Sequence, residues 1–114
     1  MVVPVPLHPS RQRLRGYNQS ALLGAQLANR LGLTHAPGAL IRVRPTPPQV
    51  GLDAAARRLN VRDAFRCPDP AAVRGLNVWL VDDVVTTGAT VTEAARVLRR
   101  AGARQIWAVA VAHD

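Results

Sequence analysis

The apolar residues of this chain follow two patterns: short continuous runs typical of β-strands, and a repeat every three to four residues typical of α-helices. Runs typical of strands cover residues 2–7, 40–43, 63–67, 77–81 and 105–112, and helical patterns cover residues 19–31, 53–59 and 91–101. Because strands and helices alternate, the pattern predicts an α/β fold, with a mainly parallel sheet flanked by helices. The chain shows neither an internal repeat nor a domain linker, so we expect a single domain over residues 1–114.

The helix predicted over residues 19–31 has signals at both ends. Asn18 is a favourable N-cap residue, and Gly32 suits the position just after the last turn. A spacing of four places Leu23, Leu27 and Leu31 on one apolar face, with Gly24 and Ala28 beside them. Residues 8–16, before this helix, are polar and basic and are predicted to form a loop.

The two most apolar runs, residues 77–81 and 105–112, are predicted to be strands buried on both faces, as in parallel sheets. Each of these runs carries one tryptophan, Trp79 and Trp107. Because tryptophan buries a large apolar area, we expect both side chains in the core.

The charge of the chain is unevenly placed. The sequence has 15 arginines, no lysine and 7 acidic residues, which gives a formal net charge of +8. Ten of the arginines lie in residues 1–66 with only two aspartates, whereas residues 67–114 are neutral. Such an excess indicates an anionic partner, either a phosphate-rich small molecule or a nucleic acid, although a merely solvated surface gives the same count. The absence of lysine excludes a Walker-type phosphate loop and Schiff-base chemistry.

Smaller features exclude further classes of protein. No apolar run reaches the ~18 residues that a membrane helix needs. The apolar start of the chain is short, rich in proline and followed rather than preceded by charges, unlike a signal peptide. The single cysteine, Cys67, excludes an internal disulfide framework and a cysteine-built zinc site. These features predict a cytoplasmic protein without a membrane span.

The stretch that carries chemistry is VWLVDDVVTTGAT, residues 78–90. Its strand delivers two adjacent carboxylates, Asp82 and Asp83, at the carboxyl end, where ligands of open α/β sheets bind. Small and hydroxyl-bearing residues then lead into a helix, so backbone N–H groups and the helix N-terminus can bind a phosphate. The carboxylates suit vicinal sugar hydroxyls or Mg²⁺. Together these features predict a site for a ribose 5-phosphate.

Part of this stretch has an explanation that needs no ligand. Thr90 and Glu93 are spaced as a capping box, in which each side chain bonds a backbone N–H of the first helical turn. A capping box explains neither the paired aspartates nor Thr86, Thr87 and Gly88. We therefore favour the functional interpretation.

This motif resembles the phosphoribosyl pyrophosphate (PRPP) motif of type I phosphoribosyltransferases. The resemblance extends over nearly the whole chain to the ComF (competence protein F) family, phosphoribosyltransferase-like proteins linked to DNA uptake in naturally competent bacteria. It is carried by the segments VPVPLHPSRQRLRGYNQSALLGAQLANRLGL and IRVRPTPPQ, the Arg58/Asn60 pair and Ala64-Phe65. The resemblance implies the Rossmann-like fold of the type I phosphoribosyltransferases.

The resemblance also implies roles for individual residues. The 5-phosphate of PRPP would be held by five consecutive residues: Thr86, Thr87, Gly88, Ala89 and Thr90. Asp82 and Asp83 would face the ribose hydroxyls and place Mg²⁺ indirectly, through PRPP, with no direct protein ligand to the metal. Three residues after the first strand would bind pyrophosphate: Pro6, Leu7 and His8. Residues 44–60 would form a flexible hood that includes Arg44, Gln49, Arg57 and Arg58, and Arg58 would join the two aspartates in catalysis.

The implied activity is that of a Mg²⁺-dependent transferase of the glycosyltransferase class, in which an acceptor attacks the ribose C1 and pyrophosphate leaves. PRPP or another nucleotide would be the small-molecule partner, and a homodimer is also expected. The alternative is a competence factor that keeps the fold but binds single-stranded DNA or a recombination protein.

Two departures from the family pattern bear on these expectations. Family members commonly carry an N-terminal four-cysteine zinc module, which this chain does not contain, so it is either a natural short form or a chain whose N-terminus was removed. Thr86 stands where many purine-salvage transferases have an aspartate that takes a proton from the base, which disfavours a hypoxanthine or guanine substrate.

Overall fold

The computed structural model describes residues 1–8, 10, 12–13, 16–45, 51–85 and 88–113, and these contain two sheets. The larger sheet is parallel and has the strand order β1-β4-β5, with β1 at Val2–Pro4, β4 at Asn77–Val85 and β5 at Gln105–His113. The smaller sheet pairs β2 (Ile41–Arg42) with β3 (Phe65–Arg66) in antiparallel register.

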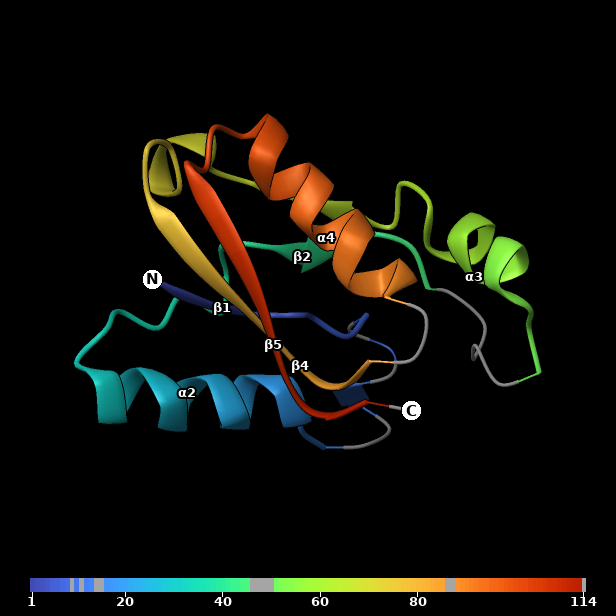
Figure 1. Cartoon of the computed structure of the whole chain (residues 1–114), viewed down its shortest axis with the longest axis horizontal. Coiled ribbons are helices and arrows are strands. Elements are labelled where there is room, and N and C mark those ends of the chain that lie inside the picture. The colour runs from blue at the N-terminus through green and yellow to red at the C-terminus, as the bar shows by residue number, and fades with distance from the viewer. Residues whose placement is uncertain (9, 11, 14–15, 46–50, 86–87, 114) are drawn as a thin grey trace.

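The helices of the described residues are α2 (Gln19–Leu31), α3 (Ala54–Val61) and α4 (Ala89–Arg100), with a 3-10 turn at Pro70–Ala72. Figure 1 shows α2 on one side of the parallel sheet and α4 on the other, with α3 beside α4. The predicted α/β fold, with a mainly parallel sheet flanked by helices, is confirmed.

The prolines of the first strand are compatible with its edge position. The N–H of Val5 donates to Val81 O of β4 at 2.8 Å, whereas the N–H of Val2 donates away from β4, to Thr34 O at 2.8 Å. Because bonding directions alternate along a strand, the nitrogen of Pro4 lies on the side away from β4. Its missing N–H therefore removes no bond between β1 and β4.

Helix α2 packs on the sheet through the predicted apolar face, but the small residues of that face are buried more deeply than its leucines. Asn18 caps the helix and Gly32 ends it with a φ of 67°, as predicted. However, the buried residues are the small ones, Ser20, Gly24 and Ala28, and Leu31 is 54% exposed. The helix approaches the sheet closely, since a Cβ at Gly24 would lie 3.1 Å from His35 Nε2. Leu23 and Leu27 are partly buried and pack beside this contact line.

The prediction that the last strand is buried on both faces is wrong. β5 is the outer strand of the parallel sheet, and α2 packs on β1 and β4. Trp107 is 42% exposed and Val111 is 73% exposed. Trp107 stacks on the half-buried Trp79, with 5.2 Å between ring centroids. The sequence pattern shows only that the residues of a strand are apolar. The position of the strand within its sheet decides whether a helix covers them.

The predicted loop at residues 8–16 contains helical turns. Ser10, Gln12 and Arg13 are helical. The N–H of Gln12 donates to His8 O at 3.1 Å, and the N–H of Gly16 donates to Gln12 O at 2.7 Å. Each of these bonds joins residues four positions apart, as in a helix. Backbone groups of this polar segment therefore bond to one another.

Asn18 joins the end of β1 to the start of α2, and its removal tests this junction. Its Oδ1 accepts the N–H of Ser20 at 3.0 Å, and its Nδ2 donates to Val5 O at 3.3 Å. We expect Asn18→Ala to lower the free energy of unfolding by ~1–2 kcal/mol in urea titrations. Asn29→Ala, at an exposed position inside the same helix, is the control and should leave stability unchanged or slightly raised. Equal losses in both variants would contradict this role.

Candidate functional site

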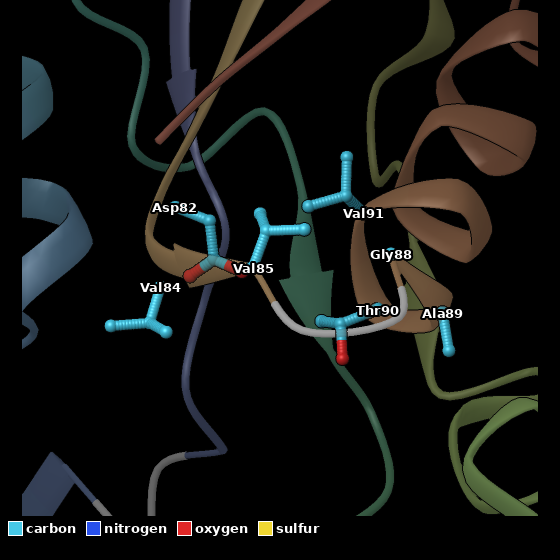
Figure 2. A pocket seen from close by; sticks show the side chains of 7 residues that line it. All are labelled: Asp82, Val84, Val85, Gly88, Ala89, Thr90 and Val91. Atoms are coloured by element: carbon cyan, nitrogen blue, oxygen red, sulfur yellow. The ribbon is translucent and has the colours of Figure 1, made fainter. Parts of the chain in front are cut away.

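The carboxyl-terminal part of β4 and the first turn of α4 enclose a cavity of about 240 Å³. Figure 2 shows Asp82 on the β4 side of this cavity and Gly88, Ala89 and Thr90 on the α4 side. Its lining comes entirely from these two elements and the residue that caps α4: Asp82, Val84, Val85, Gly88, Ala89, Thr90 and Val91. The fold therefore brings one of the two predicted carboxylates, Asp82, and part of the predicted phosphate loop to one cavity, whereas Asp83 does not line it.

Asp82 and Asp83 lie inside β4 and not after it, because the strand continues to Val85. The Oδ1 atom of Asp82 accepts the Ser20 hydroxyl at 3.2 Å and the N–H of Asp83 at 2.9 Å. Burial, followed by hydrogen bonding to Asp83 and its charge, raises the pKa of Asp82 to about 6. In the described part of the chain, neither carboxylate has an arginine partner.

The start of α4 has the geometry of an anion-binding helix end. Gly88 is the N-cap residue, with a φ of 83° that favours glycine, and Ala89 is buried behind it. Short side chains at the start of a helix allow an anion to approach its backbone N–H groups closely. Thr86 and Thr87, also predicted to bind the 5-phosphate, lie outside the described residues.

The capping-box explanation of this segment is wrong. Thr90 lies inside the helix, because α4 begins at Ala89, and the cap makes no side-chain hydrogen bond. The Glu93 carboxylate, which would have bonded the helix start, instead accepts hydrogen bonds from Arg96 Nε. Capping therefore does not account for Thr90 and Glu93.

The residues predicted to bind pyrophosphate follow β1 on the same edge of the sheet. Pro6 is buried, and Leu7 and His8 are partly buried. The ring Nδ1 of His8 lies 2.8 Å from the hydroxyl of Ser10, so the imidazole is held against its own turn. The turn is kept beside β4 by the bond from the N–H of Val5 to Val81.

Arg44, one of the residues predicted to form the hood, contacts the end of α3. Arg44 donates from Nη2 to Asn60 O at 3.0 Å and to Arg62 O at 2.5 Å, so its guanidinium holds the end of α3. This contact stabilises α3, because the last carbonyls of a helix attract cations. Gln49 lies outside the described residues.

Arg58, predicted to belong to the hood, shares a cavity with two residues predicted to bind the 5-phosphate. It lines a second cavity, of about 390 Å³, between α3 and the first turns of α4, together with Gly88 and Ala89. Arg57 has a buried Nε atom with no hydrogen-bond partner in the described residues. Both arginines belong to α3, so the position of this helix decides what their guanidinium groups can reach.

A salt-bridge network that the sequence analysis did not identify joins α3 to α4. Arg96 on α4 bonds the buried Glu93 and also Asp63 Oδ1, at 3.1 Å, just after α3. Asp63 has a φ of 55°, the only left-handed residue other than glycine among those described. The spacing of Glu93 and Arg96 by three residues was a signal for the first pair, but only the fold brings Asp63 to them.

Among the described residues, no group of three or more histidine, cysteine, aspartate or glutamate side chains could hold a metal ion. Among these residues, no helix is both long enough and apolar enough to cross a membrane.

Comparisons with known proteins agree with this geometry. Residues 18–114 match the model of the family described as "Phosphoribosyl transferase domain". The chain is 46% identical over 108 residues to the DNA utilization protein YhgH of Salmonella typhi, covering 93% of this chain and 47% of that protein. It is 40% identical over 112 residues to the competence protein F of Haemophilus influenzae, covering 96% of this chain and 49% of that protein. The chain thus spans about half the length of these relatives.

Among solved structures, the chain is similar to the glutamine PRPP amidotransferase of B. subtilis complexed with ADP and GMP. The TM-score is 0.58 at 26% identity, over 96% of this chain and 22% of that one. The predicted resemblance to type I phosphoribosyltransferases of the ComF type is therefore confirmed, and this chain belongs to the phosphoribosyl transferase domain family.

Proposed function

We propose that this chain binds PRPP with Mg²⁺ in the cavity between β4 and α4 and transfers its ribose 5-phosphate group to an acceptor, releasing pyrophosphate. The observation that supports the proposal most is the juxtaposition in this cavity: a partly buried carboxylate, Asp82, faces a glycine-capped helix start. Carboxylates accept hydrogen bonds from sugar hydroxyls, and helix N-termini bind phosphate. A ribose 5-phosphate presents both groups.

The residues present fit a magnesium ion held mainly by its substrate. Asp82 and Asp83 are adjacent. Burial is the main cause of the raised pKa of Asp82, and hydrogen bonding to Asp83 and repulsion from its charge raise it further. A divalent cation nearby would relieve that repulsion, and oxygen atoms are the ligands that Mg²⁺ prefers. Bound Mg²⁺ would supply stabilisation of the charge that develops on the departing pyrophosphate. Phosphate oxygens of PRPP and water would supply the ligands of the ion, with the two carboxylates nearby.

In the proposed reaction, a lone pair of the acceptor forms a bond to the ribose C1 while the bond from C1 to the pyrophosphate oxygen breaks. Pyrophosphate leaves with the electron pair of that bond, and the acceptor loses its proton to solvent. Arg58 and Arg57, carried by α3, would stabilise the leaving group, because arginine keeps its charge at any ordinary pH. Pro6, Leu7 and His8 would hold the pyrophosphate from the opposite side.

Calorimetry tests the proposed site directly. We expect PRPP to bind in the presence of Mg²⁺ and much more weakly with a chelator. Asp83→Asn and Thr87→Ala should each raise the dissociation constant at least ~10-fold, about 1.4 kcal/mol. Asp69→Asn, an exposed aspartate beside the 3-10 turn, is the control and should bind as the parent does. Unchanged affinity in both site variants would refute the proposal.

The desolvated Asp82 also predicts a pH dependence of stability. Its pKa is about 6 in the folded chain, against 3.8 ordinarily, so the unfolded chain loses this proton first as the pH rises. Asp82 therefore does not lower the free energy of unfolding below about pH 4. It lowers this free energy increasingly between pH 4 and 6, and by a constant amount above pH 6.

We expect Asp82→Asn to raise the free energy of unfolding by ~1–3 kcal/mol at pH 8 without Mg²⁺, and to have little effect near pH 4. Urea titrations at the two pH values measure the difference. Asp69→Asn serves again as the control. If the substitution raised the free energy of unfolding equally at both pH values, ionisation of Asp82 would not be the cause.

A second candidate function is binding of single-stranded DNA. It is favoured by the similarity to proteins named DNA utilization protein and competence protein F, and by the positive excess of residues 1–66. The arginines of that part include several exposed side chains, among them Arg13, Arg30, Arg62 and Arg66. Such a surface attracts phosphate backbones without reading their sequence.

Fluorescence anisotropy with a labelled oligonucleotide tests this candidate. Affinity should fall steeply with salt, because bound counterions are released from the DNA. The double variant Arg62→Gln/Arg66→Gln should bind more weakly than Arg99→Gln/Arg104→Gln, which changes two exposed arginines of the neutral part. Absence of binding at low salt would rule out direct DNA binding and leave a protein partner.

A further inference from the structure

The outer edge of β5 is a long strand edge that no described part of the chain covers. β5 runs from Gln105 to His113 and pairs with β4 on one side. In the described residues, no strand lies beyond it. Proteins usually protect such edges with charged residues, prolines or bulges. The sequence from Gln105 to Ala112 has neither a charge nor a proline.

The sheet register identifies the backbone groups that point outward. Val81 bonds β1, so the even-numbered residues of β4 bond β5. Leu80 is level with Ala108, and in a parallel pair a residue bonds the two neighbours of the one opposite it, here Trp107 and Val109. The N–H and C=O groups of the even-numbered residues of β5 therefore point away from β4: Ile106, Ala108, Ala110 and Ala112.

The side chains of β5 are also suited to a partner. Trp107 and Val111, both exposed, lie on the face that α2 shares, since Trp107 stacks on Trp79 and Val109 packs in the α2 cluster. A hollow of about 300 Å³ lies between α2 and the end of β5, beside Val109 and Val111. Apolar side chains and a hollow thus lie along the same unprotected edge.

We propose that a second copy of this chain pairs its own β5 antiparallel to this edge, about a two-fold axis at Val109. This register sets Trp107 of one copy opposite Val111 of the other, twice, and brings each Trp107 toward the hollow beside the opposite Val111. The hydrogen-bonded pairs become Ala108 with Ala110, whose small side chains let the backbones approach. The two sheets then join into one of six strands.

The charge distribution favours a second copy over an anionic partner at this place. Two chains of +8 repel each other, and an uncharged strand is where they can meet with the least repulsion. Raising the salt concentration should therefore strengthen the dimer, since salt screens repulsion between charges outside the contact. Nucleic-acid binding would respond to salt in the opposite direction.

Analytical ultracentrifugation of the 114-residue chain tests the proposal. We expect a concentration-dependent dimer, whose dissociation constant rises at least ~10-fold in Ala110→Pro, which removes an outward N–H. Val111→Lys should have the same effect. Leu59→Lys is the matched control, because Leu59 is 68% exposed on α3 and Val111 is 73% exposed on β5. Circular dichroism identifies any variant that fails to fold.

A disulfide tests the register without destabilising the strand. Val109→Cys lies on the proposed axis, and opposed Cα atoms at a non-hydrogen-bonded pair are about 4.5 Å apart, so oxidation should cross-link two copies. Gln105→Cys is the control, because its two copies would lie eight residues apart along the strands, ~27 Å. The buried Cys67 should not compete. A monomer at all concentrations, or a dimer indifferent to Ala110→Pro and Val111→Lys, would overturn the proposal.

Discussion

The parallel alignment of β1 with β4 is the constraint on which the rest of the structure depends. Val3 is level with Leu80 and Pro4 with Val81, so the two strands end at the same edge of the sheet. The turn after β1, the carboxylates of β4 and the start of α4 then lie together, although some eighty residues separate the first from the last. A parallel pair needs a long crossover connection, and in this chain that connection includes α2, β2, α3 and β3.

A partly buried carboxylate at the same edge of the sheet lowers the stability of the folded chain. Asp82 is partly buried next to Asp83, with a serine hydroxyl and a backbone N–H as its partners. Desolvated, adjacent carboxylates disfavour the folded state at neutral pH. In the proposed site, sugar hydroxyls and a cation would offset this cost when the ligand binds. Binding and stability are therefore expected to respond in opposite directions when a carboxylate is removed.

Side-chain contacts connect α3, which was predicted to belong to the hood, with α4, whose start lines the cavity. Arg44 bonds carbonyl oxygens at the end of α3, and Arg96 links Asp63, just beyond α3, to Glu93 on α4. Glu93 is buried, so its carboxylate needs the arginine partner. Three arginines that look alike in the sequence thus differ in role: Arg44 and Arg96 fix the helix, and Arg58 faces the cavity between α3 and α4.

The sequence by itself determined the order of strands and helices and the location of the chemistry. The alternation of runs predicted the α/β fold, Asn18 and Gly32 marked the ends of α2 as found, and the motif around Asp82 and Gly88 identified the cavity. These features are local: capping, periodicity and a strand that leads through a short loop into a helix depend on neighbouring residues alone.

Only the tertiary structure decided which predicted apolar residues are buried and which polar residues pair. Leu31 and Trp107 have the pattern of core residues but are exposed, because α2 meets the sheet through Ser20, Gly24 and Ala28 and does not cover Trp107 of the outer strand β5. Asp63 and Arg96 pair across 33 residues because α3 and α4 pack together. Periodicity reports that a side chain is apolar, whereas burial depends on which element lies opposite, and that is a property of the whole fold.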